Sequence, residues 1–343
     1  MSERDLKNYS CGMLLGLAIG DALGAPIEFG FTVSDIAKLG DKIENYYDNP
    51  RGPSGAWTDD TSMALCLADS LVARKGYDSY DIMTRYYNWM RSGYRAHPDM
   101  PLDIGMQTLD ALHIFHRNAV VHHNAPKTRS AGNACIMRLA PIVIANLVPD
   151  HKYTATNAKT NDITIMLKQA KLSCMETHNS LMAETVTIMF ATTLYLAICG
   201  YSKRDILKYC DVGITQTELK EAKDTVQKQL SRVVDDKTGA SFRELGGYCL
   251  DTFLIALWGL VNFENFKDGM LAVIRLGGDT DTNGAVYGQL AGAFYGRDDI
   301  PQKWIKGLYL HNEVEHIAND LLAMKSCPII RTRFEGDKNF IPV

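Results

Sequence analysis

The chain has 343 residues, of which 46% are hydrophobic and 22% charged, and its formal net charge is −4. This composition is typical of a folded globular protein with enough apolar side chains for a large core, and it argues against a disordered or fibrous chain. The small negative charge and the lack of a long basic stripe argue against a surface that binds nucleic acid.

The cysteines and the first residues indicate a cytoplasmic protein. No Cys-x-x-Cys pair occurs, so we expect reduced, mostly buried thiols and neither a disulfide framework nor a zinc site. Charged residues from Glu3 to Lys7 precede a short apolar run that Asp21 interrupts, so we expect no signal peptide. No stretch of about 18 apolar residues lacks a charge, so we expect no membrane span. The eight cysteines are residues 11, 66, 135, 174, 199, 210, 249 and 327.

Apolar residues recur at helical spacing along most of the chain, and alternating runs typical of strands are scarce. Residues 41–56 hold several Pro and Gly residues and are predicted to form a loop, as is the polar stretch 150–163. Mixed charges over 215–237 predict an exposed amphipathic helix. No boundary divides the chain, so we predict one all-α domain over residues 1–343. The clearest helical segments are 60–74, 134–147, 181–199, 249–262 and 284–295.

Two acidic segments each precede an apolar helix. Alone, "TDDT" at 58–61 is typical of a helix cap, because Thr and Asp accept free N–H groups and early acids suit the helix dipole. However, "GGDTDT" at 277–282 repeats the arrangement. Four carboxylates in one partly dry site would repel each other, and a divalent cation would neutralise them. Oxygen ligands favour Mg²⁺ or Mn²⁺ over zinc or copper, and the adjacent Asp59 and Asp60 could serve two neighbouring ions.

The segment "SAGN" at 130–133 precedes a predicted helix and offers free N–H groups and a positive dipole end to an anion. Gly132 would allow close approach of a ligand to the backbone. An ordinary capped helix explains the same residues equally well. His178 and Tyr248 also stand near apolar helices, where such residues are more often structural than functional.

Five segments in this order resemble the ADP-ribosylglycohydrolase family, which includes the dinitrogenase-reductase-activating glycohydrolase and the ADP-ribosyl-acceptor hydrolases. The resemblance covers roughly residues 10–325. The segments are "GLAIGDALGAPIEF" at 16–29, "WTDDTSMAL" at 57–65, "SAGNACIMRLAPI" at 130–142, "ETHNSLMA" at 176–183 and "LGGDTDTNGAVYGQLAGAFYG" at 276–296.

This resemblance implies a compact, orthogonally packed all-α fold with two Mg²⁺ or Mn²⁺ ions. Glu28 matches a glutamate at the metal site that moves when substrate binds, and Asp21 is expected to be a buried structural acid. The family usually has Gly where this chain has Ala134, whose methyl group would crowd the ligand or require another backbone conformation. The implied metal ligands are Thr58, Asp59, Asp60, Asp279, Asp281 and Thr282. The implied ADP-ribose-binding residues are Ser130, Gly132, Asn133, His178 and Tyr248.

The implied reaction is hydrolysis at C1″ of ADP-ribose, which releases ADP-ribose from a modified protein or a small-molecule conjugate, with arginine as the favoured acceptor. Asp59 or Asp60 would accept the proton of the attacking water, and Glu28 would assist at the site. One alternative is a hydrolase of O-linked (serine or ester) or free ADP-ribose derivatives. Another is a non-catalytic ADP-ribose-binding protein of the same fold, which loss of a metal aspartate would favour; none is lost here.

Overall fold

The computed structural model describes residues 3–48, 52–97, 100–121, 131–147, 163–324 and 326–332. Within them the chain forms sixteen α-helices and one pair of short parallel strands, so the predicted all-α fold is confirmed. Tyr77 of β1 pairs with Ile329 of β2. The loop predicted over 150–163 lies almost wholly outside the described residues.

The first half of the chain builds α1 to α8 and β1. These are α1 (Glu3–Gly24), α2 (Val33–Leu39), α3 (Asp59–Arg74), β1 (Tyr77–Asp78), α4 (Ser79–Ser92), α5 (Met106–Asn118), α6 (Ala134–Met137), α7 (Ala140–Ala145) and α8 (Thr164–Thr177). The second half builds α9 (Leu181–Ile198), α10 (Lys203–Tyr209), α11 (Lys220–Asp235), α12 (Cys249–Asn262), α13 (Phe266–Ile274), α14 (Thr280–Tyr295), α15 (Gln302–Gly307), α16 (His311–Leu322) and β2 (Ile329–Arg331).

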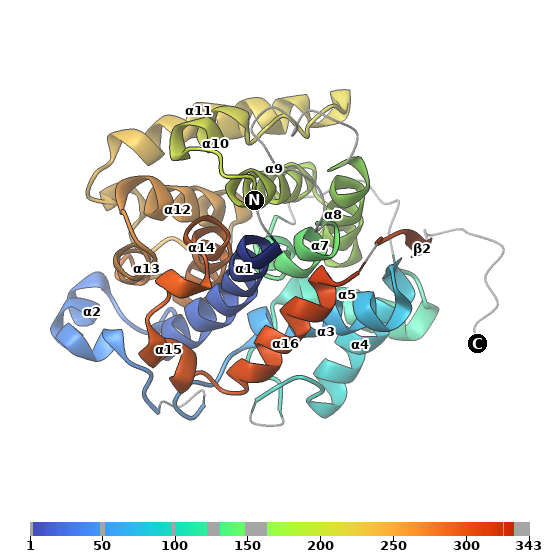
Figure 1. Ribbon diagram of the computed structural model, residues 1–343, viewed down its shortest axis with the longest axis horizontal. Helices are drawn as coiled ribbons and strands as arrows, with labels where there is room; N and C mark the ends of the chain where they lie inside the picture. The colour runs from blue at the N-terminus through green and yellow to red at the C-terminus, as the bar shows by residue number, and fades with distance from the viewer. Residues whose placement is uncertain are drawn as a thin grey trace.

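Helices α1 and α14 lie side by side in the middle of the molecule (Figure 1). Glycines spaced four residues apart bring their backbones into contact, and a Cβ atom on Gly12 would lie 2.6 Å from the Gly292 carbonyl oxygen. The helices run antiparallel, since Gly12 meets Gly292 and Gly20 meets Gly284. The end of α1 therefore meets the start of α14, which brings Glu28 close to Asp281.

By length and hydropathy alone, two helical segments of the described chain would suffice to cross a membrane, Asp5–Ile27 and Leu181–Ile198. Here 94% and 89% of those stretches are buried inside the fold, as is usual for core helices. All eight cysteines are also buried, and none forms a disulfide, as expected.

The single helix predicted over 134–147 is wrong, because the structure has two helices, α6 and α7. Pro141 lies in the first turn of α7, where a backbone N–H has no partner within the helix, so its missing N–H costs nothing there. Its ring disfavours helical geometry in the residue before it, so α6 does not continue into α7. Gln289 of α14 fills the break. Its side-chain oxygen accepts from the Ala140 amide at 2.8 Å, and its Nε2 donates to the Met137 carbonyl at 2.7 Å.

The other predicted helices are present as α3, α9, α12 and α14. The amphipathic helix predicted over 215–237 is present as α11, which buries Val226 and Val233 and exposes most of its charges. The predicted loop over 41–56 begins inside a short 3₁₀ helix, Gly40–Glu44.

Glu176, near the end of α8, makes the stability depend on pH. It is buried, it accepts a hydrogen bond from the Tyr77 hydroxyl at 2.6 Å, and its Oε2 atom has no partner among the described residues. Burial raises its pKa from 4.5 to about 8. The folded state thus keeps a proton that the unfolded chain loses, so stability should fall as pH rises from 4.5 to about 8.

Glu176→Gln keeps the oxygen that accepts from Tyr77 but cannot ionise. We therefore expect its free energy of unfolding to increase, relative to that of the unmodified protein, as pH rises. The gain should be at most about 1.4 kcal/mol per pH unit. Urea unfolding at pH 5 and pH 8 measures it. An equal difference between the two proteins at both pH values would contradict this explanation.

Candidate metal centre and ligand pocket

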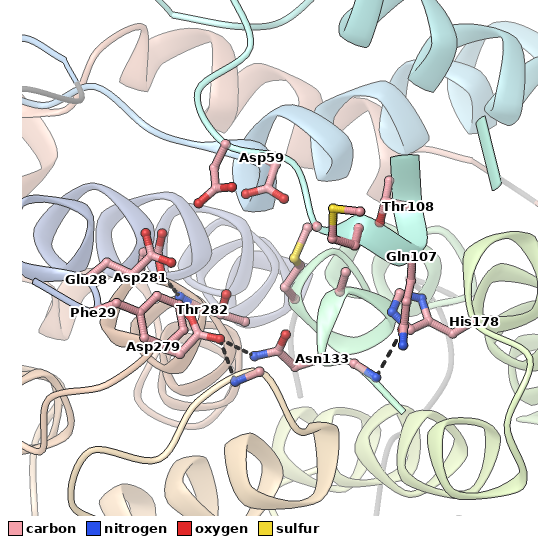
Figure 2. Close-up of a pocket in the computed structure, with 17 residues that line it drawn as sticks. Glu28, Phe29, Asp59, Gln107, Thr108, Asn133, His178, Asp279, Asp281 and Thr282 are labelled. Carbon is pink, nitrogen blue, oxygen red and sulfur yellow. Dashed lines mark hydrogen bonds between the residues drawn. The ribbon is translucent and has the colours of Figure 1, made fainter. Parts of the chain in front are cut away.

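A pocket of about 320 Å³ opens where the first turns of α3, α5, α6 and α14 converge (Figure 2). Among the described residues, its lining includes five carboxylates, from Glu28, Asp59, Asp103, Asp279 and Asp281, and neither lysine nor arginine. Glu28, Asp279 and Asp281 lie together at one side of the pocket, and Gln107 and His178 lie at the other (Figure 2). The arrangement favours binding of cations at the acidic side.

The start of α3 is capped by Asp21 of α1 and not by its own aspartates. The two carboxylate oxygens of Asp21 accept from the Thr58 amide at 2.9 Å, the Thr61 amide at 3.0 Å and the Thr61 hydroxyl at 2.6 Å. The Thr58 hydroxyl donates to Asp21 as well, at 2.9 Å. This confirms the structural role expected for Asp21. It also leaves Asp59 and Asp60 free for a role other than capping.

Two groups of three carboxylates lie close enough to hold metal ions. Asp21, Asp60 and Asp281 form one triad, and Glu28, Asp279 and Asp281 form the other; within each triad the oxygens lie within 4.8 Å of one another. Asp281 belongs to both, as expected for a carboxylate between two ions. Oδ1 of Asp60 is buried and has no hydrogen-bond partner among the described residues. An unpaired buried carboxylate oxygen is costly, so a cation fits this position.

The start of α14 is held by the chain before α6 and α12. Oδ2 of Asp279 accepts from the Asn133 side-chain amide at 2.8 Å and from the Gly247 backbone amide at 2.9 Å. Asn133 also donates to the Thr252 hydroxyl at 3.0 Å. Asn133, which the resemblance assigned to ADP-ribose, therefore holds the Asp279 carboxylate in place here. Thr282 lines the pocket next to Asp281, as the metal assignment requires.

The carboxylates of the cluster resist ionisation. Burial raises the pKa values of Asp59, Asp60 and Asp281 well above the usual range, and neighbouring carboxylates raise them further. Burial also raises the pKa of Asp21 to about 6, although its hydrogen bonds to Thr58 and Thr61 oppose the change. Bound cations would stabilise the ionised forms and so reverse these shifts.

Asp59 lines the pocket but belongs to neither triad. Of the neighbouring charges, Asp103 contributes most to its raised pKa. Asp103 lies before α5 with a φ of +66°, a left-handed conformation that is uncommon outside glycine. Sequence reasoning missed Asp103, because a single Asp in "PLDIGM" carries no motif. It also missed Gln107 and Thr108 of the lining.

Gly132, Gln107 and His178 meet at the far side of the pocket. The Gly132 amide donates to the Gln107 side-chain oxygen at 3.2 Å, and a Cβ atom on Gly132 would lie 2.8 Å from both that oxygen and Nε2 of His178. Burial lowers the pKa of His178 to about 3, so its ring is neutral, and its Nδ1 lies 2.8 Å from the Thr177 hydroxyl. Ala134, at the position where the family usually has Gly, also lines this side.

Ser130 is outside the described residues. Three other predicted site residues, Asp60, Tyr248 and Thr58, are not part of the lining, although Asp60 belongs to the first triad. The backbone of Tyr248 pairs with that of Gly132, but its half-exposed ring is not part of the lining. Thr58 is buried behind the pocket, and its hydroxyl lies 2.9 Å from Asp21 and 3.3 Å from Oδ2 of Asp60.

Comparison with known proteins shows the family to which the chain belongs. Residues 2–328 match the ADP-ribosylglycohydrolase family. The chain is 30% identical to the ADP-ribosylarginine hydrolase Tri1 of Pseudomonas putida, over 90% of this chain and 76% of that protein. It is 28% identical to the ADP-ribosyl-[dinitrogen reductase] glycohydrolase of Rhodospirillum rubrum, over 94% of this chain and 99% of that protein.

A solved structure titled "ADP-ribosylglycohydrolase-related protein complex" superimposes with a TM-score of 0.71 and 32% identity, over 94% of this chain and 99% of that one. The match to the family thus extends over nearly the whole chain and agrees with the carboxylate-lined pocket found in the structure. The chain therefore belongs to the ADP-ribosylglycohydrolase family and is an enzyme of that family.

Proposed function

We propose that this chain is a divalent-metal-dependent hydrolase that cleaves the glycosidic bond at C1″ of ADP-ribose and releases ADP-ribose from modified arginine side chains. The observation that carries the proposal is the pair of carboxylate triads that share Asp281 beside a pocket lined by five carboxylates. Family membership supports the reaction, since the family acts on ADP-ribosylated substrates.

The residues at the acidic side fit two ions of the Mg²⁺ or Mn²⁺ type, because every donor is a carboxylate or hydroxyl oxygen. Asp60, Glu28, Asp279 and Asp281 would hold them, with the hydroxyls of Thr58 and Thr282 and the carboxylate of Asp59, the first aspartate of α3, as further ligands. When bound, such ions supply Lewis acidity that orients the ribose hydroxyls and makes a water molecule more acidic.

Asp59 is the group we favour as proton acceptor for the attacking water, and Asp60 is the second choice. Asp59 lines the pocket but belongs to neither triad, so its carboxylate is less engaged in metal binding than those of Asp60 and Asp281 and more available to accept a proton. Glu28 lies in one triad and also faces the pocket, where its carboxylate can stabilise the positive charge that develops on the sugar.

Arginine is the favoured acceptor because the pocket is acidic. Asp59 and Asp103 present two carboxylates in the same lining, and a guanidinium group pairs with carboxylates through charge-assisted hydrogen bonds. A neutral serine linkage gains nothing from these charges. Two relatives named as ADP-ribosylarginine hydrolases support the same choice.

The test is a comparison of arginine-linked, serine-linked and free ADP-ribose derivatives, each incubated with Mn²⁺ or with EDTA while release of ADP-ribose is followed. We expect the arginine conjugate to be cleaved fastest, and only with metal. Faster cleavage of a serine-linked or free derivative would support the alternative hydrolase. Binding of ADP-ribose without release from any substrate would support the non-catalytic alternative and contradict the proposal.

Gly132→Val tests the placement of ADP-ribose at the far side of the pocket. The new side chain would enter the space between Gln107 and His178. Its Cβ atom would lie 2.8 Å from the side-chain oxygen of Gln107 and 2.8 Å from Nε2 of His178. We expect ADP-ribose binding, measured by calorimetry, to weaken about tenfold or more, which corresponds to a loss of about 1.4 kcal/mol. KM should rise by a similar factor for every acceptor, since the product lacks the acceptor. A loss that depends on the acceptor would place ADP-ribose elsewhere.

A further inference from the structure

A second hollow of about 320 Å³ lies where α2, α12 and α13 meet, on the side of the molecule opposite α4 and α5 in Figure 1. Its floor is apolar, with Ile36, Trp258 and Leu276 almost fully buried and Phe263 half-buried beside them. No residue that lines it also lines the first pocket. Its volume falls in the range of small-molecule sites.

The rim of this hollow carries three cationic side chains. Lys237, Arg243 and Arg275 all line it and are exposed, and its lining contains no carboxylate. Lys237 donates to the neutral Asn262 side chain at 3.1 Å. None of the three forms an ion pair with a carboxylate in the part of the chain that the structure describes.

The acids close to the rim cations already have other partners. Glu44 interacts with Arg275 but is paired with Lys267 at 2.8 Å and with Lys303 at 3.7 Å. Oε1 of Glu244 accepts from the Val33 amide at 3.1 Å, and Oδ2 of Asp236 accepts from the Ser241 amide at 2.7 Å. These carboxylates are therefore fixed in local contacts. An anion from outside the chain is the natural partner for the rim cations, and its apolar part would cover the floor.

Two short segments connect the walls of this hollow to the carboxylate cluster. Leu276 accepts from the Glu244 amide at 2.9 Å, and the chain reaches Asp279 three residues later. On the other wall, Val33 follows Glu28 by five residues. The two segments meet where the Phe29 amide donates to the Gly278 carbonyl at 2.9 Å. A ligand that moves either wall would thus move a carboxylate of the Glu28–Asp279–Asp281 triad.

We propose that this hollow is a second ligand site, which takes a small organic anion with a flat apolar body, and that its occupation alters the carboxylate cluster. The apolar body lies on Trp258 and Leu276, and the anionic group lies between Arg243 and Arg275. This site is separate from the one that performs hydrolysis. By linkage, a ligand here and a metal at the cluster must change each other's affinity by the same factor.

The probe is 1-naphthalenesulfonate, titrated into the full chain while the indole N–H signals of its four tryptophans are followed by NMR. The Trp258 indole donates to the Asp236 carbonyl at 2.6 Å beside the hollow, and Trp258→Phe assigns its signal. We expect a saturable shift of this signal that exceeds the shifts of Trp57, Trp89 and Trp304. Naphthalenemethanol, which lacks the charge, and sulfate, which lacks the apolar body, should bind at least about tenfold more weakly.

The variant Arg243→Ala/Arg275→Ala removes two of the three rim charges and leaves the apolar floor intact, and we expect it to weaken binding of the probe about tenfold. The control, Lys228→Ala/Lys306→Ala, removes two exposed charges outside the hollow and should leave the affinity unchanged. Equal affinity in both variants, equal binding of the neutral analogue, or no saturable Trp258 shift would each overturn the site.

The coupling is tested by repeating the titration with Mn²⁺ and with EDTA. We expect the affinity for the probe to differ about fivefold or more between the two conditions. The same affinity in both would overturn the proposed link to the cluster. The Trp258 signal reports binding whether or not the protein is active, so these results do not depend on the proposed hydrolysis.

Discussion

Asp60→Asn is expected to reduce the rate of ADP-ribose release about a hundredfold or more, and Asp281→Asn should do the same. Asp60 lies in one triad, with an unpartnered buried oxygen, and Asp281 lies in both. Each substitution keeps the size of the side chain and removes one negative charge from the place where cations would bind. The double variant should lose far less than the product of the single losses, because both residues serve one centre.

Stability separates this role from a structural one. Asp60→Asn relieves repulsion among buried carboxylates, and its new amide group can donate to the carboxylates of Asp21 or Asp281, which lie in the same triad. The metal-free variants should therefore melt at or above the temperature of the unmodified protein. Asp21→Asn also removes a charge from this triad, but Asp21 caps α3, so the metal-free Asp21→Asn protein should be destabilised. Active but destabilised Asp60 and Asp281 variants would contradict the metal role.

The second large effect concerns the contact between α1 and α14. Gly288→Val would place a side chain against the backbone of Gly16, with no flexible group to give way. The two helices would have to separate, and the core would lose contacts along both. We expect a loss of stability above about 4 kcal/mol, beyond the usual range for single substitutions, or failure to fold.

Urea unfolding followed by circular dichroism measures this effect. Gly30→Val is the matched control, because a Cβ atom on Gly30 would meet only the Glu28 carbonyl oxygen, at 3.5 Å. It should keep a midpoint close to that of the unmodified protein. If Gly288→Val also unfolds at the urea midpoint of the unmodified protein, close packing of the α1 and α14 backbones is not required for stability.

The sequence predicts the helices well where one apolar face repeats without interruption, as in α3, α9 and α12. It also predicts that the loops before α3 and α14 meet, because the same acidic arrangement occurs before both helices and favours a shared metal site over two separate helix caps. The four-residue glycine spacing in α1 and α14 was a further signal of their contact, visible in the sequence as Gly12, Gly16 and Gly20 opposite Gly284, Gly288 and Gly292.

Other features depend on contacts between distant segments and leave no local signal. Asp21 caps a helix that begins 38 positions later in the chain, and Asn133 holds Asp279 across 146 positions. Asp103 lines the pocket from an irregular segment and itself has a left-handed backbone conformation. The break between α6 and α7 is stable because Gln289, from α14, occupies it. None of these contacts can be predicted from the residues adjacent in sequence.

The most direct test of the central claim is a titration of metal-stripped protein with Mn²⁺, in which bound ions and the release of ADP-ribose from an arginine conjugate are measured in the same samples. The two triads that share Asp281 predict about two ions bound per chain, with activity that rises as they bind and disappears again when EDTA is added. Full release by the stripped protein in the presence of EDTA would contradict the account.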